Sequence, residues 1–171
     1  MPIAIELSKS GRLHPSAWVV PCCLLVALCL ALLAAIPAFA AGDTGRHFNL
    51  DAEGYAINRF DPVAYFTMHK AVKGDTAYTA SHGGARYAFA SEEHLRMFLA
   101  DPERFVPQYG GHCAYGAAYG SKSSIDPELW EIVDDRLFLL INPGTMSVWQ
   151  KRKDEYIRSA DRAWKALVES N

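Results

Sequence analysis

The sequence predicts an α+β fold: a small antiparallel sheet of hairpins, packed with short helices and a long amphipathic C-terminal helical segment. Three observations support this prediction. Two pairs of short β-favouring runs flank turn residues, around Gly83-Gly84 and around Asp134-Asp135. Asp-Pro dipeptides and a capping serine mark helix starts. From Thr145 onward, apolar residues recur at helical spacing. No regular β-α-β repeat is present, so a parallel sheet is not expected.

Residues 1–40 have the pattern of a secretory signal peptide. An uncharged apolar run from Val19 to Ile36 is followed by Ala38-Phe39-Ala40, the small-x-small pattern that signal peptidase cleaves. We expect cleavage after about Ala40 and a periplasmic or secreted protein that meets the membrane only before cleavage. The alternative is an uncleaved membrane anchor, because the run approaches the roughly 20 apolar residues that span a bilayer.

The charge of the chain argues against nucleic acid as a partner. Of 17 basic and 19 acidic residues, two basic and one acidic residue precede the expected cleavage site, so the remainder carries a net charge of −3. Its largest basic cluster, Lys151-Arg152-Lys153, is followed directly by two acidic residues.

We expect residues 41–53 to form a flexible polar tail and residues 54–171 to form a single domain.

The first half of this domain alternates predicted strands and helix starts. The segment from Tyr55 to Phe60 predicts a short strand. Asp61-Pro62 predicts a helix start, because an aspartate caps free N–H groups and a proline fits the first helical position. Thr76 to Ser81 and Arg86 to Ala90 predict a hairpin, since two glycines separate them.

Three further helix starts are predicted downstream. Ser91 is expected to cap a helix whose apolar residues recur at i, i+3 and i+4, namely Leu95, Phe98 and Leu99. The dipeptides Asp101-Pro102 and Asp126-Pro127 repeat the pattern of Asp61-Pro62, and each is expected to restart a helix.

The C-terminal half combines a second hairpin with helices. Cys113 to Tyr119 is rich in alanine and glycine and is expected to be helical. Leu129 to Val133 and Leu137 to Ile141 predict the hairpin. From Thr145 onward one face of the helical segment is expected to pack in the core, through Trp149, Tyr156, Ala160, Ala163, Trp164 and Leu167.

Cys113 is the only cysteine outside the signal segment, and it follows Gly110-Gly111-His112. At a helix N-terminus beside a histidine, a thiol becomes a better nucleophile or redox centre, with His112 or another histidine as its activator. No second thiol is available to resolve an oxidised form, so an external redox partner would be needed. The alternatives are an inert buried cysteine and a metal ligand.

Two binding sites are also possible. His82, His94, His112 and Cys113 flank the predicted hairpin, helix and loop, and together they would suit copper or zinc, although none has a tight ligand spacing. An aromatic pocket for a small ligand is the other possibility. Its candidates are Tyr65, Tyr87, Tyr109 and Trp130, with Gly110 and Gly111 as loop residues that permit close approach of a ligand.

Several motifs resemble the YHS domain: Gly54-Tyr55, Asp61-Pro62-Val63-Ala64-Tyr65-Phe66, Tyr87 to Ser91, Asp101-Pro102 and Pro107 to Ala114. The resemblance runs from about Gly54 to Leu167. It is strongest to small exported YHS proteins, some of which carry selenocysteine in the Gly-Gly-x-Cys-Ala motif. The resemblance therefore implies a thiol-dependent redox or detoxification role. The alternative is a non-catalytic module that binds a metal or a small ligand.

The chain departs from metal-handling YHS domains at the cysteines of that family. The motifs of those domains resemble Asp-Pro-Val-Cys and, further along, Phe-Cys-Ser-x-x-Cys. In this chain the three cysteine positions are occupied by Ala64, Ala90 and His94. Since alanine cannot coordinate a metal, the cysteine site of the wider family is not expected in this chain.

Overall fold

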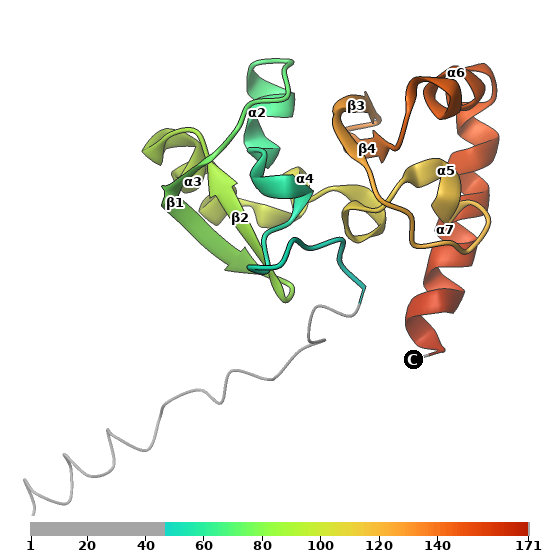
Figure 1. Ribbon diagram of the computed structural model, residues 1–171, viewed down its shortest axis with the longest axis horizontal. Coiled ribbons are helices and arrows are strands. Elements are labelled where there is room, and N and C mark those ends of the chain that lie inside the picture. Colours follow the sequence, from blue (N-terminus) through green and yellow to red (C-terminus); the bar gives the residue numbers. More distant parts are fainter. Residues whose placement is uncertain (1–46, 171) are drawn as a thin grey trace, which may run out of the picture. The chain divides into compact units, whose positions relative to one another are not determined.

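Two antiparallel hairpins form the sheets of this protein (Figure 1). The computed structural model describes residues 47–170, so the predicted signal segment and most of the predicted tail lie outside the described residues. Strand β1 (Asp75–His82) pairs with β2 (Ala85–Phe89), and β3 (Asp126–Val133) pairs with β4 (Arg136–Leu140). Together with the helices described below, the hairpins confirm the predicted α+β class and both predicted pairings.

The predicted strand from Tyr55 to Phe60 is wrong. Its centre is the 3-10 turn η1 (Ile57–Arg59), and all three residues of this turn have positive φ values between 49° and 65°. Left-handed backbone cannot continue a strand ladder. Only isolated bridges remain in this segment, and they pair Tyr55 with Arg86, Ala56 with Leu50 and Phe60 with Lys73.

The first two predicted helix starts are confirmed. Helix α2 (Pro62–Thr67) begins after Asp61, whose side chain accepts hydrogen bonds from the first turn. Helix α3 (Glu92–Ala100) begins after Ser91, whose Oγ accepts the N–H of His94 at 3.2 Å. Of the apolar positions predicted for α3, Phe98 is fully buried but Leu99 is 60 % exposed. The apolar stripe is therefore narrower than predicted.

The two later Asp-Pro dipeptides behave differently from each other. Asp101-Pro102 opens the short helix α4 (Pro102–Phe105), as predicted. Asp126-Pro127 opens strand β3, so the predicted helix there is wrong. The Asp126 carboxylate accepts the N–H of Glu128 at 3.0 Å, and Asp126 pairs with Leu140. Pro127 has no N–H to donate, and it lies where the register of this ladder shifts, a position that tolerates proline.

The C-terminal helical segment consists of two helices. Helix α6 (Pro143–Lys151) and helix α7 (Lys153–Glu169) are separated by Arg152, whose backbone is not helical. Helix α7 packs against the short helix α5 (Ala114–Ala117), and the two lie side by side in Figure 1. Trp149 and Ala160 are fully buried, as expected for the predicted core face. None of the helices among residues 47–170 has the length and apolarity to span a bilayer.

The loop between α4 and α5 runs alongside strand β4. It contains the 3-10 segment η2 (Gln108–Gly111), and on either side of η2 the chain bridges β4 in parallel, Pro107 with Leu137 and Cys113 with Leu139. Strand β4 itself is buried from Leu137 to Leu140. The loop predicted as the functional centre is thus part of the packing around this strand.

Candidate functional site

The glycine loop is shaped by a close backbone approach. Tyr109 and Gly110 have φ values of 55° and 59°. A Cβ on Gly110 would lie 2.0 Å from the carbonyl oxygen of His47, so only glycine fits there. Asn49 donates its backbone N–H to Gly110 O at 2.9 Å and its side-chain Nδ2–H to Gly111 O at 3.1 Å. These contacts give Gly110 and Gly111 a structural role in holding the loop against residues 47–49.

Cys113 lies in the hydrophobic core and is 1 % exposed. It precedes α5, as predicted. Its N–H donates to Ser123 O at 3.1 Å, and its carbonyl accepts the N–H of Ala117 at 2.9 Å. A nucleophilic thiol must meet its substrate, and this one has almost no contact with solvent. The geometry favours the inert alternative for Cys113.

His112 is also buried, with 8 % of its surface exposed. Its Nδ1 lies 3.2 Å from the carbonyl oxygen of Ser123, which can only accept, so Nδ1 carries the hydrogen. Its Nε2 is buried, and within residues 47–170 this nitrogen has no hydrogen-bond partner. Neither ring nitrogen therefore bonds to Cys113. Burial lowers the pKa of His112 below its ordinary value, and the Ser123 hydrogen bond only partly opposes this. The nearby Lys122 and His47 lower that pKa further.

We expect the buried His112 to make the protein less stable as the pH falls. In the unfolded chain its imidazole takes up a proton near pH 6.5, whereas in the folded chain the lowered pKa resists protonation. The unfolded state then binds more protons, so the free energy of unfolding decreases below that pH. His112→Asn keeps a donor for Ser123 O, and it should flatten the pH dependence measured by urea denaturation between about pH 7.5 and 5.5.

A matched variant separates this effect from the general loss of a histidine. His69→Asn removes an exposed imidazole, and asparagine tolerates the positive φ of this residue. If His112→Asn and His69→Asn change the pH dependence to the same extent, burial of His112 is not the cause.

A second polar centre lies around Asp61, which is fully buried. Its Oδ1 accepts the N–H groups of Val63 at 2.8 Å and Ala64 at 3.3 Å. Its Oδ2 accepts the N–H of Ala90 at 2.8 Å and lies 2.6 Å from Nδ1 of His94. One carboxyl group thereby joins α2, the end of β2 and α3. The sequence predicted Asp61 as a helix cap but did not predict its partnership with His94.

The predicted aromatic residues fall at different places. Tyr65 is buried, its hydroxyl donates to Pro127 O at 3.0 Å, and burial raises its pKa. Tyr87 is also buried, and its ring packs against Phe98. The hydroxyl of Tyr109 donates to Asp161 Oδ1 at 2.9 Å, and its ring lines a pocket of about 310 Å³. Trp130 lines a separate pocket of about 500 Å³.

The pocket at Trp130 combines apolar and charged side chains. We call it the Trp130 pocket. Its lining residues are Phe66, His69, Arg104, Trp130, Glu131, Ile132 and Asp135. The Trp130 ring contacts Tyr65 edge-on at a centroid distance of 5.2 Å, and Phe66 contacts Phe105 at 5.4 Å. The two aromatic rings that line the pocket are therefore supported by rings in the core.

Residues 63–109 match the model of the YHS domain family. The chain contains a YHS domain. The match extends from α2 to η2, so it includes Asp61's partners Val63, Ala64, Ala90 and His94 as well as Phe66 and Arg104 of the Trp130 pocket. No match was found among curated proteins or among solved structures.

The YHS domain brings together the three positions at which metal-handling relatives are expected to carry cysteine. Ala64 and Ala90 donate their N–H groups to Asp61, and His94 contacts the same carboxyl group. The other nitrogen of His94, Nε2, lies 3.2 Å from Oγ1 of Thr67. In this YHS domain the three positions thus surround a hydrogen-bonded carboxyl group, and two of them offer no side-chain ligand.

The histidines and the cysteine of the predicted copper or zinc set do not come together within the described part of the chain. His82 lies at the end of β1 and contacts Glu103, His94 lies on α3 and contacts Asp61, and His112 contacts Ser123 O. Between residues 47 and 170, no three His, Cys, Asp or Glu side chains are grouped to hold a metal ion. In the described residues, the three histidines of this predicted set therefore contact three different partners.

Proposed function

We propose that this YHS-domain protein is an exported, non-catalytic module that binds a small aromatic carboxylate in the Trp130 pocket. Export is inferred from the Ala38-Phe39-Ala40 pattern after the apolar run. The binding role is inferred from the pocket, whose volume of about 500 Å³ is typical of small-molecule sites. The observation that carries the proposal is the pairing of supported aromatic rings with an arginine in one pocket.

The apolar part of the pocket suits a planar ring. Phe66 of α2 and Trp130 and Ile132 of β3 provide apolar surface from two elements that are far apart in the sequence. Aromatic pairs prefer offset or edge-to-face contact, and both aromatic rings are already held in such pairs. A ligand would therefore lose little free energy in ordering these rings.

Arg104 suits the carboxylate of such a ligand. Its guanidinium lies over the ring of Phe105, 5.6 Å from the centroid, and within residues 47–170 it has no ion pair. The carboxylate of Glu131 is already occupied, because it accepts the indole N–H of Trp149 at 3.0 Å and contacts Lys153. Arginine binds a carboxylate through two parallel hydrogen bonds, which would fix the orientation of the ligand.

The proposal is tested by titrating the protein with indole-3-acetate as probe and following amide shifts by NMR. We expect shifts at residues that line the Trp130 pocket. Trp130→Ala and Arg104→Gln should each weaken binding about tenfold, as expected for one aromatic or charge-assisted contact. Arg96→Gln removes an exposed arginine of α3 and should leave binding unchanged. Saturable binding that survives Trp130→Ala would place the ligand elsewhere and contradict the proposal.

The thiol-dependent redox or detoxification role predicted for Cys113 rests on the sequence and on the resemblance alone. Its burial leads us to expect that iodoacetamide alkylates the folded protein far more slowly than the unfolded protein at the same pH. Mass spectrometry after timed labelling, with and without about 6 M urea, measures this difference. Rapid labelling of the folded protein below pH 8 would restore Cys113 as a candidate redox centre.

A further inference from the structure

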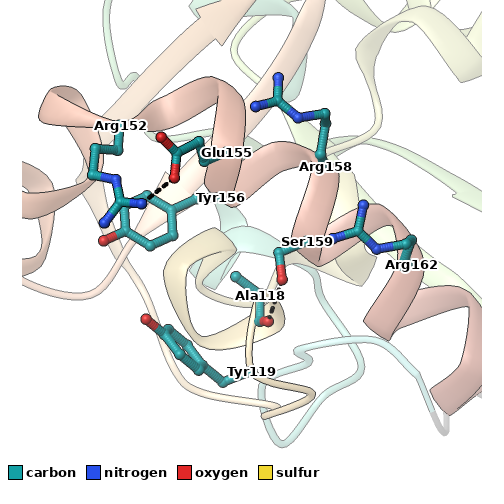
Figure 2. A pocket seen from close by; sticks show the side chains of 8 residues that line it. All are labelled: Ala118, Tyr119, Arg152, Glu155, Tyr156, Arg158, Ser159 and Arg162. Carbon is teal, nitrogen blue, oxygen red and sulfur yellow. Dashed lines mark hydrogen bonds and ion pairs between the residues drawn. The ribbon is translucent and has the colours of Figure 1, made fainter.

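A second pocket lies between α5 and α7, outside the residues that match the YHS domain (Figure 2). We call it the arginine pocket, and its volume is about 470 Å³. It is lined by Ala118, Tyr119, Arg152, Glu155, Tyr156, Arg158, Ser159 and Arg162. Ser159 donates its hydroxyl hydrogen to Ala118 O at 3.0 Å, which ties α7 to the end of α5 at the base of the pocket.

The lining carries a positive charge that is unusual for this protein. It contains three guanidinium groups and one carboxylate, and the carboxylate of Glu155 is turned toward Arg152, with which it is paired (Figure 2). Within residues 47–170, Arg158 and Arg162 have no ion pair. The whole chain has a formal net charge of −2, so this pocket is a local reversal of sign. Unpaired arginines in a concave surface favour an anion.

The aromatic side chains beside these arginines form a connected group. Tyr115 contacts Tyr119 and Tyr156 at centroid distances of 5.2 and 5.0 Å, and Tyr156 stacks on Trp149 at 6.2 Å. Tyr119 is nevertheless 67 % exposed, with its ring beside the pocket. An exposed ring next to unpaired guanidinium groups is suited to a ligand that has both a planar part and an anionic part.

We propose that the arginine pocket binds a small phosphate monoester, with Arg158 and Arg162 holding the phosphate and Tyr119 contacting a planar group attached to it. The planar, multiply donating guanidinium matches the geometry of phosphate oxygens. A long polyanion such as nucleic acid is disfavoured, because the rest of the protein is acidic and would repel it. The site is separate from the Trp130 pocket, so each can fail without the other.

The test is equilibrium binding of phenyl phosphate to the purified protein, followed by NMR. We expect saturable shifts at residues of the arginine pocket. The double variant Arg158→Gln/Arg162→Gln should bind phenyl phosphate about tenfold more weakly or worse. Arg96→Gln, which removes one exposed arginine elsewhere, should bind as the parent does. Unchanged thermal unfolding of the double variant would show that the loss is not a folding defect.

A third variant tests the role of the ring. Tyr119→Ala should weaken the binding of phenyl phosphate but not of inorganic phosphate, which has no planar group. Phenyl phosphate binding that is indifferent to both arginines would overturn the proposal. So would binding to phosphatidylglycerol vesicles without binding to phenyl phosphate, because the arginines would then serve a lipid surface.

Discussion

Asp61→Ala is expected to destabilise the protein by about 3–5 kcal/mol, because the variant leaves three backbone N–H groups and one imidazole nitrogen without an acceptor. Each buried group that loses its hydrogen bond costs about 1–3 kcal/mol. The groups concerned are the N–H of Val63, Ala64 and Ala90 and Nδ1 of His94. Partial relaxation of the site reduces the sum of these costs. Urea denaturation measures the difference in the free energy of unfolding.

Asp101→Ala is the matched control for Asp61→Ala. Asp101 also precedes a proline at a helix start, but it is exposed and its side chain makes no capping hydrogen bond. It should cost no more than about 0.5 kcal/mol, as is usual for surface substitutions. Equal costs for the two variants would show that the buried network around Asp61 adds nothing to the fold.

Gly110→Ala is expected to cost about 3–5 kcal/mol, near the upper end of the range for single substitutions. The new Cβ would lie 2.0 Å from the carbonyl oxygen of His47 and 3.2 Å from Cα of Phe48, and both are backbone atoms that no rotamer change can move away. The left-handed backbone at this residue adds its own cost for any side chain. Thermal or urea unfolding of the variant measures the sum.

Gly120→Ala separates the two causes. Gly120 also has a positive φ, of 70°, but a Cβ there meets no atom within 4 Å. It should show only the backbone cost, about 1–2 kcal/mol. If Gly110→Ala costs no more than Gly120→Ala, the segment from His47 to Asn49 yields to the new methyl group, and the close approach is not what requires glycine.

Local signals predicted most of the elements correctly. Asp61 and Ser91 each accept hydrogen bonds from the helix that follows, as residues of these types usually do. The two hairpins turn at Gly83-Gly84 and at Asp134-Asp135, all four of which have the positive φ that tight turns demand. At these positions the backbone conformation in the structure is the one that the residue type prefers.

The failures arose where distant partners overrule the local pattern. Asp126-Pro127 has the same dipeptide as Asp61-Pro62, but pairing with β4 makes it the start of a strand. Cys113 has the neighbours of a reactive thiol, and nothing in a sequence shows that β4 and Ser123 cover it. Asp61 and His94 are separated by 32 intervening residues, and their contact depends on how α2 and α3 pack. In the sequence, the one indication of this contact was that His94 occupies a cysteine position of metal-handling YHS domains and Asp61 lies three residues before another, Ala64.

The arginine pocket was missed for a related reason. Arg158 and Arg162 are four residues apart on the polar side of an amphipathic helix, which is the usual pattern of a solvated face. Their pocket exists only because the end of α5 lies against α7. Sequence periodicity describes one helix at a time, so it cannot show what a second helix adds.

The parallel bridges between the glycine loop and β4 have a consequence for solubility. On one side β4 pairs with β3, and on the other side the backbone near Pro107 and Cys113 meets Leu137 and Leu139. An apolar strand with a bare edge is a template for pairing with other chains, and a covering loop removes that template. Changes that loosen the loop should therefore promote aggregation at high protein concentration before they unfold the domain.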